Sequence, residues 1–457
     1  VLVPRQVLTA KSMTFSADPG ELQISGDGRL SGIPFSGSWV QPVGAPDVAG
    51  RVNVSLELSA ETLKTLNVVV PSGVIAGKTT AKVTLKVVKN KPTFFDISSN
   101  LKGVILNIPT LKWRKPKSVL GAINFKGTFS KPLKINGFVF TAPGLSTRGR
   151  INFDANGLES IFLSDLIVAD WLTAEVTLTN RGTNVPMQVL VTDGSLDLRK
   201  FPQGETKVQT SSAIAAPLMA NLTRLQISDS IALTDVSAEF PNGIGSGGLF
   251  SGQINGGTLI SGSAMGSGKK LQLDINSQDG GGALRDAGLL RKATGGVMDL
   301  QLTPAEGGWN GDLKISSVRI KDAPQIAQLL SAVSIIGLPD QLDGRGIFFD
   351  TLDSKFNLKN ELFTIYESSA VGPSLGMSLD GYINTKSKQL DLQGVLSPFY
   401  MLNGIGAILT RRGEGLIGFN FNLSGGTAQP DVAVNPLSLF TPGMFREIFR
   451  RKPPEQE

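Results

Sequence analysis

The chain of 457 residues contains no cysteine and no histidine. The absence of cysteine excludes disulfides, thiolate nucleophiles and cysteine-based metal sites. The absence of histidine removes the usual general base of serine hydrolases. Charged residues make up 18% of the chain, below the roughly 25% of a typical soluble domain. The sequence also has no run of about 18 apolar residues, which a membrane-spanning helix requires.

The charge balance is mildly basic, with a formal net charge of +6 and a pI near 9.3. Lysine and arginine are scattered along the chain, and no RNA-binding or zinc-finger pattern accompanies them. This favours a solvated basic surface over a nucleic-acid interface, so no nucleic-acid partner is predicted. Two basic clusters suit anionic lipid headgroups. They are Lys112, Arg114, Lys115 and Lys117 around Trp113, and Arg446, Arg450, Arg451 and Lys452 at the end of the chain.

The main positive signal is an alternation of apolar and polar residues with a period of two. It is clearest over residues 377–383, 390–396 and 417–423, and it also occurs near residues 52–58 and 81–87. A β-strand with this pattern has one apolar and one polar face. Further strands are predicted near 93–100, 119–127, 133–141, 146–153, 159–167, 171–179 and 186–193.

Turn signals follow every eight to twelve residues, as in Gly26-Asp-Gly28 and Asn180-Arg-Gly182. This spacing predicts a mainly β fold in which neighbouring strands are antiparallel. We expect a long curved antiparallel sheet that forms an open hydrophobic groove, with a few short helices. A turn-rich stretch at 201–217 divides the chain, and the expected parts are 1–210 and 211–457.

Helical patterns are few. Residues 60–66 and 281–290 predict short helices, and 322–333 predicts a longer one with Asp322 as its cap and Pro324 in its first turn. We expect this longer helix to pack over or beside the end of the groove. Residues 440–449 predict a terminal amphipathic helix with Met444, Phe445 and Phe449 on its apolar side.

Three short patterns resemble catalytic or cofactor-binding motifs. Gly372, Ser374 and Gly376 match the spacing of a nucleophile elbow, but no histidine is present and a strand is predicted to follow. The glycines from Gly243 to Gly248 lack the helix and the acidic residue of a dinucleotide site. Ser99-x-x-Lys102 and Ser267-x-x-Lys270 lack the companion motifs of a serine-lysine enzyme. We therefore predict no catalytic residues, cofactor or metal, although a pair of carboxylates for sugar hydrolysis stays possible.

The apolar faces have two interpretations, and the pattern alone favours the simpler one. Most alternating strands bury their apolar face in an ordinary core. The other interpretation is a groove that holds apolar ligands.

Several stretches resemble the C-terminal region of AsmA-like proteins, most of all the large YhdP-type members, which are related to the TamB type. The resemblance is carried by 322–338 with 344–350, by 378–384 running on to 390–398, by 403–406 with 415–419, and by 425–443. The resemblance extends over roughly 270–448. Over 1–210 the chain is similar only in the general style of its sequence.

The resemblance implies a bridge-like lipid carrier of a Gram-negative bacterium. Such a protein guides phospholipid along a hydrophobic β-groove between the inner and outer membranes. It lies in the periplasm and is anchored to the inner membrane, here through a segment upstream of this chain. The implied partners are phospholipid, the surface of the outer membrane and a further envelope protein. The alternative is a periplasmic structural or assembly factor that transports nothing.

Two sets of site residues follow from these hypotheses. The predicted groove residues are Met377, Leu379, Ile383, Leu390, Leu392, Ile417, Phe419, Phe421 and Leu423. The predicted membrane-contact residues are Met444, Phe445, Arg446, Ile448, Phe449 and Arg450. An apolar face flanked by arginines suits an interfacial helix, but it also suits a helix that folds back and caps the last strands.

Overall fold

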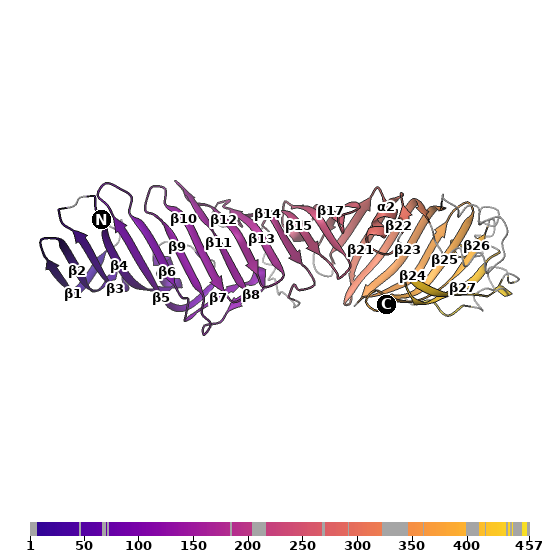
Figure 1. Cartoon of the computed structure of the whole chain (residues 1–457), viewed down its shortest axis with the longest axis horizontal. Helices are drawn as coiled ribbons and strands as arrows, with labels where there is room; N and C mark the ends of the chain where they lie inside the picture. The colour runs from indigo at the N-terminus through magenta and orange to yellow at the C-terminus, as the bar shows by residue number, and fades with distance from the viewer. Residues whose placement is uncertain are drawn as a thin grey trace. The chain divides into compact units, whose positions relative to one another are not determined.

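The computed structural model describes residues 7–44, 47–65, 70, 73–182, 185–202, 216–266, 270–290, 292–321, 346–359, 361–398, 411–415, 417–435, 437–438, 441 and 450–454. In this part the chain is mainly β, with 28 strands and two short α-helices. The strands build a curved, unclosed sheet whose pairs are antiparallel with one exception, which confirms the predicted fold class (Figure 1).

The chain separates into two compact units, Val1–Gln226 and Ile227–Glu457. The boundary lies later than the predicted residue 210. The reason is that β15 (Leu218–Gln226) pairs with β14 (Gln188–Asp197) in parallel, from Val189 opposite Leu218 to Asp197 opposite Gln226. This parallel pair adds the strand after the turn-rich stretch to unit 1.

Unit 1 is a meander in which successive strands mostly pair with each other. In addition to β14 and β15, its strands are β1 (Leu8–Ala17), β2 (Glu21–Leu30), β3 (Ile33–Pro42), β4 (Gly50–Ser59), β5 (Ile75–Val87), β6 (Phe94–Ser99), β7 (Val104–Ile108), β8 (Trp113–Lys115), β9 (Ala122–Thr128), β10 (Lys134–Ala142), β11 (Leu145–Asp154), β12 (Gly157–Val168) and β13 (Leu172–Thr179). Strand β6 pairs with β9, so β7 and β8 stand between them in sequence only; they form a hairpin that pairs with the first residues of β5. The strands predicted between residues 93 and 193 are confirmed.

Unit 2 is a second meander. Its strands are β16 (Ala232–Phe240), β17 (Gly248–Ile254), β18 (Leu259–Met265), β19 (Gln272–Ser277), β20 (Ala293–Thr294), β21 (Val297–Ala305), β22 (Gly308–Ile320), β23 (Ile347–Lys359), β24 (Leu362–Val371), β25 (Leu375–Asn384), β26 (Gln389–Pro398), β27 (Phe419–Gly426) and β28 (Gln429–Asn435). Apart from β7, β8 and β20, the strands of each unit follow one another in chain order (Figure 1).

Bulges recur along both meanders. The register shifts between Ile135 and Phe138 in β10, and between Ser146 and Gly149 in β11. In unit 2 it shifts between Thr234 and Ser237 and between Ile365 and Ser368. A bulge bends its strand and increases the local twist, which accounts for the curvature of the sheet.

The helices are short. Helix α1 (Ala60–Thr65) confirms the helix predicted at 60–66, and α2 (Gly280–Asp286) begins one residue before the predicted helix at 281–290 and ends earlier. Asp279 caps α2 by accepting a hydrogen bond from the Gly282 amide at 2.8 Å. Two 3-10 turns are η1 (Pro109–Leu111) and η2 (Ile244–Ser246).

Two further predictions fall outside the part of the chain that the structure describes. These are the helix over 322–333 and nearly all of the helix over 440–449. Among the described residues, no helix combines the length and the apolarity needed to cross a membrane.

Candidate functional site

In unit 2, cross-strand pairing collects apolar side chains on one face of the sheet. Residues that lie directly opposite each other on neighbouring strands point to the same face. Met377 is opposite Leu396, which is opposite Phe419. Gly381 is opposite Leu392, which is opposite Leu423. We call the side that holds these residues the apolar face.

Eight of the nine predicted groove residues lie on this face. Leu379 joins it through Gly394 and Phe421, and Ile383 through its partner Leu390. Leu392, Phe419 and Phe421 are buried, and the other five are half-buried. Ile417 is the exception, because it precedes β27 and its side chain is 52% exposed.

The apolar face continues along the meander towards its first strands. In β23, Phe356 lies opposite Ile365 of β24 and Gly311 of β22. Leu313 lies opposite Leu300 of β21, which is opposite Ile275 of β19. The same face therefore runs across successive strands of unit 2.

Unit 1 has an apolar face built in the same way. Trp39, Val52, Leu85 and Phe95 form one row across β3 to β6. Further on, Leu163 pairs with Val176, which pairs with Val191. Within β4, β5, β6, β9, β10 and β11 the face contains no charged residue.

Two small elements lie against the apolar faces. In unit 1, residues 101–115 form a flap that holds η1 and the β7–β8 hairpin, and its Trp113 packs edge-on against Phe140 with ring centroids 5.8 Å apart. In unit 2, a Cβ at Gly280 of α2 would meet the side chains of Ile315 and Met298. Away from the flap, Val54, Val83, Ile97 and Phe125 of unit 1 are only partly buried. The described elements therefore cover parts of the apolar faces and not their whole length.

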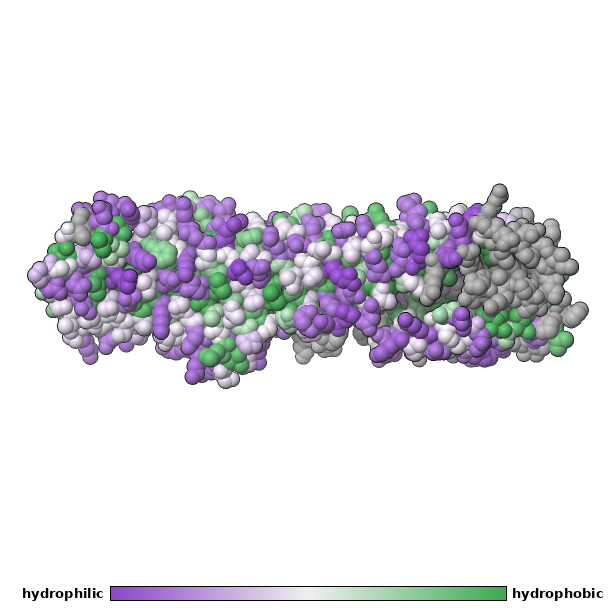
Figure 2. All heavy atoms as spheres, viewed as in Figure 1, coloured by the Kyte–Doolittle hydropathy of each residue, from purple (hydrophilic) through white to green (hydrophobic). Residues whose placement is uncertain are grey.

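The polar face of unit 1 is basic over six of its strands. On β4, β5, β6, β9, β10 and β11 it holds eight exposed cations and three carboxylates. The cations are Arg51, Lys78, Lys82, Lys86, Lys126, Lys134, Arg148 and Arg150, and the carboxylates are Glu57, Asp96 and Asp154. On the side seen in Figure 2, hydrophilic and hydrophobic residues are interspersed.

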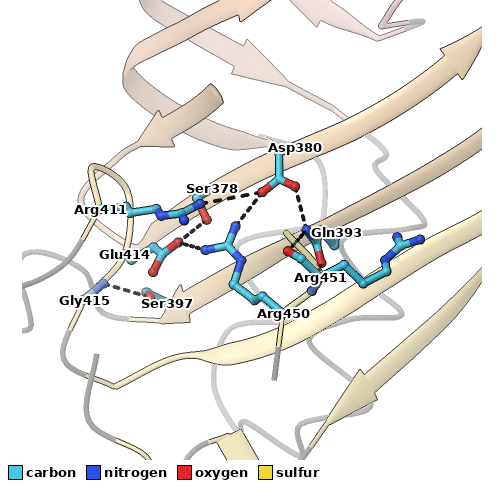
Figure 3. A network of polar contacts seen from close by, with 9 residues as sticks. All are labelled: Ser378, Asp380, Gln393, Ser397, Arg411, Glu414, Gly415, Arg450 and Arg451. Atoms are coloured by element: carbon cyan, nitrogen blue, oxygen red, sulfur yellow. Dashed lines mark hydrogen bonds and ion pairs between the residues drawn. The ribbon is translucent and has the colours of Figure 1, made fainter. Parts of the chain in front are cut away.

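A buried ionic cluster lies on the polar face of unit 2, which is the side opposite the predicted groove residues. Arg450 donates to Asp380 of β25 at 2.7 Å and to Glu414 at 2.5 Å (Figure 3). The side chain of Arg450 is 3% exposed, and those of both carboxylates are 2% exposed. We call Asp380, Glu414 and Arg450 the ionic cluster.

Neutral polar groups complete the cluster. Ser378 donates to Glu414 at 2.6 Å, and Gln393 of β26 donates to Asp380 at 2.7 Å. Gln393 also exchanges hydrogen bonds with the backbone of Arg451, at 2.7 and 2.9 Å. Buried charges are tolerated only when they are paired and their remaining hydrogen bonds are made. The cluster therefore fastens residues 450–451 and 411–415 to two strands.

The neighbouring residue, Arg451, is held differently. Its guanidinium makes two hydrogen bonds to Asp391 at 2.7 Å, but the two side chains are 56% and 51% exposed. The Arg451 guanidinium lowers the pKa of the Asp391 carboxyl below its usual value. Of two consecutive arginines, Arg450 therefore forms two buried ion pairs and Arg451 forms one exposed ion pair.

The predicted membrane-contact residues have different outcomes. Arg450 is buried in the ionic cluster, and this corrects its assignment to an exposed membrane-binding face. Its contacts are of the kind expected if the end of the segment folds back onto the sheet. Met444, Phe445, Arg446, Ile448 and Phe449 lie outside the described residues.

The basic cluster around Trp113 is not one exposed patch. Lys115 is 1% exposed, and its ammonium donates to the carbonyls of Leu101, Val104 and Pro116 at 2.8, 2.9 and 3.2 Å. The Lys112 ammonium donates to the Pro202 carbonyl at 2.7 Å and lies over the Phe201 ring. Lys115 therefore holds the two ends of the flap together, and Lys112 fastens the flap to the rest of unit 1 at Phe201 and Pro202.

We expect Lys115→Met to loosen the flap, because it leaves the carbonyls of the buried residues Leu101 and Val104 without this donor. Each unsatisfied buried acceptor costs about 1–3 kcal/mol. The free energy of unfolding should fall, and the fluorescence of Trp113 should shift to longer wavelength. Lys117→Met, at an exposed lysine two residues on, is the control. An unshifted Trp113 spectrum in Lys115→Met contradicts this role.

The same lysine should leave a signature in the pH dependence of stability. Burial lowers the pKa of Lys115 from 10.5. Between the lowered pKa and 10.5 the unfolded chain binds more protons than the folded chain, so stability rises with pH. Wild type should therefore gain stability relative to Lys115→Met as pH rises towards 10.5, and an equal response of the two proteins contradicts this.

Two of the motif-like stretches lack the helix that should follow them. Ser374 lies in the bend between the antiparallel strands β24 and β25, whereas a nucleophile elbow leads into a helix. The glycines from Gly243 are followed by η2 and then by β17, and no α-helix follows to hold a pyrophosphate.

Comparisons with known proteins identify no relative. No protein-family model matches the chain, and neither the curated proteins nor the solved structures contain a match.

Sequence reasoning did not find the ionic cluster. Asp380 and Gln393 stand on the polar side of their strands, where solvent exposure is the ordinary expectation. Their partner Arg450 is 70 residues beyond Asp380, and Arg450 is 36 residues beyond Glu414. No local pattern connects positions so far apart in sequence.

Proposed function

We propose that the apolar faces form a groove that binds the acyl chains of phospholipids, and that the chain belongs to a bridge-like lipid carrier of the AsmA-like type. The supporting observation is the register. It places apolar residues of successive strands on one face in each unit and keeps charges off that face across six strands of unit 1. The resemblance of residues 270–448 to AsmA-like proteins supports the same proposal.

The energetics suit a lipid ligand. Each buried CH₂ group contributes about 0.8 kcal/mol. An acyl chain laid across several strands therefore gains substantial free energy without any single specific contact. Such binding lets the chain move along the face in small steps, because each row of side chains offers a similar apolar surface.

The basic polar face of unit 1 supports a membrane surface as a partner. Exposed lysines and arginines near an anionic leaflet contribute about 1 kcal/mol each. In the proposed carrier, this face would meet headgroups while the apolar face holds acyl chains. The proposed setting is the periplasm of a Gram-negative bacterium.

The alternative is a structural or assembly factor of the envelope. The flap and α2 favour this alternative locally, since each covers part of an apolar face as an ordinary core would. Half-buried Val54, Val83, Ile97 and Phe125 favour the groove.

The deciding experiment is mass spectrometry of the lipids that copurify with the intact protein. We expect phospholipid in a fixed ratio to protein, and we expect Val54→Asp to reduce that ratio because it places a carboxylate on the apolar face. Asn53→Asp is the matched control, because it adds the same charge to the adjacent, exposed residue on the polar face. Wild-type protein without lipid, or equal lipid in the two variants, overturns the proposal.

A further inference from the structure

A glycine lies directly opposite a phenylalanine at six places on the apolar faces, three in each unit. The pairs are Gly28 with Phe35, Gly127 with Phe95, Gly149 with Phe138, Gly262 with Phe250, Gly311 with Phe356, and Gly394 with Phe421. The two partners come from neighbouring strands, and their separation in sequence varies widely. The register, rather than one local motif, therefore produces these pairs.

In each pair the phenyl ring lies over the glycine. A Cβ atom built on Gly394 would lie 2.7 and 2.9 Å from two atoms of the Phe421 ring. At Gly28 the corresponding distances to the Phe35 ring are both 2.8 Å. At Gly311 the three nearest atoms all belong to the Phe356 ring. The ring thus occupies the space that a side chain on the opposite strand would fill.

A ring in this position reaches across to the next strand and does not stand away from the sheet. The exposure of the rings agrees with this placement, since Phe95 and Phe421 are both 2% exposed. Glycine is a poor strand residue because it has no side chain to pack, and covering it with an aromatic ring offsets that loss. The pairs therefore keep six large side chains close to the backbone of the sheet on its apolar faces.

Glycines on the polar side lack this cover. A Cβ on Gly137, which pairs with Lys126, would approach only the Gly149 carbonyl, at 3.9 Å. Near the Gly28–Phe35 pair, a hollow of about 540 Å³ is lined by both partners and by Leu56, and also by Asp27, Glu57 and Lys78. A volume of this size is within the range of small-ligand sites.

We propose that the Gly–Phe pairs set the depth of the groove and thereby select ligands with slender, unbranched acyl chains. This inference rests on the proposed lipid-binding function. Each glycine lets a ring lie flat against the sheet, so the floor of the groove stays close to the backbone and continuous. A side chain in place of the glycine forces the ring upward, where it obstructs the path of an acyl chain.

Gly311→Ala is the most direct test, because the new methyl group meets the Phe356 ring before any other group. The measurement is binding of a phospholipid with one fluorescent acyl chain to the intact protein, expressed per folded molecule. We expect about tenfold weaker binding. The thermal midpoint should fall as well, because displacing a buried ring costs about 1–3 kcal/mol, more than alanine gains over glycine in a strand. Gly426→Ala is the control, since a Cβ there meets nothing within 4 Å.

A second substitution makes the test specific to the ring. Phe356→Leu in the Gly311→Ala background removes the ring that the methyl group displaces, so it should restore binding. If Gly311→Ala fails to fold, Phe356→Trp with the glycine retained poses the same question, because the larger indole cannot lie within the space of the phenyl ring.

The outcomes separate the two proposals. Absence of binding by wild type overturns the lipid-binding function and this inference with it. Wild-type binding together with unchanged binding by folded Gly311→Ala, or by folded Phe356→Trp where that variant is used, overturns the inference alone. Weaker binding by Gly311→Ala without recovery in the double variant also overturns it, because the ring is then not the obstacle.

Discussion

Replacement of Arg450 by methionine should destabilise unit 2 by about 3–5 kcal/mol, the range measured when one partner of a buried ion pair is removed. The physical reason is that Asp380 and Glu414, each 2% exposed, would keep their buried positions without the cation that pairs with both. Of the remaining partners, Ser378 and Gln393 are neutral donors, and Arg411 is a half-exposed cation that lies 3.9 Å from Asp380. Chemical denaturation that follows unit 2 measures the loss.

Arg451→Met is the matched control for this experiment. Arg451 is the next residue and makes a well-formed ion pair with Asp391, but the pair is exposed. Exposed pairs contribute about 0–1 kcal/mol, and the contacts of Arg451 with Gln393 use its backbone. Equal losses in the two variants would show that burial of the ionic cluster does not determine its contribution.

The second large effect is expected from Phe421→Asp on the apolar face of β27. This substitution places a carboxylate where the phenyl ring covers Gly394 and leaves the space of that ring unfilled. Loss of a buried phenylalanine costs about 3–5 kcal/mol, and an unpaired buried charge adds to that cost. We expect unit 2 to lose its cooperative unfolding transition at 25 °C, measured by circular dichroism and limited proteolysis.

Asn422→Asp is the control, since it introduces the same residue one position along the strand. Asn422 is exposed and lies opposite Gln393 on the polar face. Successive residues of a strand point to opposite faces, so this substitution lies on the surface. We expect it to change the free energy of unfolding by no more than about 0.5 kcal/mol, the usual range for a surface substitution. If Phe421→Asp and Asn422→Asp lower the free energy of unfolding by the same amount, the assignment of faces in β27 is wrong.

The strand pattern was predictable because it depends on neighbouring residues. Alternation within 377–383 and 390–396 predicts two strands, and the structure has β25 and β26 there. Since a side chain's face follows from its parity in a strand, the sequence also predicted which residues share a side. Ile417 fails this rule only because β27 begins two residues later, at Phe419.

The Gly–Phe pairs show where local reasoning ends. Glycine and phenylalanine are each visible in the sequence, but their pairing depends on register. The shift between Ile135 and Phe138 is one example, because it brings Phe138 opposite Gly149. Bulges of this kind depend on packing across several strands, and they leave no reliable local signal.

The sequence by itself therefore determined the mainly β fold, the positions of twelve strands and the division of their residues between an apolar and a polar face. These properties follow from a period of two and from turn residues, which act over a few positions. Only the tertiary structure decided the parallel β14–β15 pair, the contact of Lys112 in the flap with Pro202, and the burial of Arg450 with Asp380 and Glu414. Each depends on segments that are distant in the chain and become neighbours only when the sheet forms, so burial and pairing, rather than residue type, set their roles.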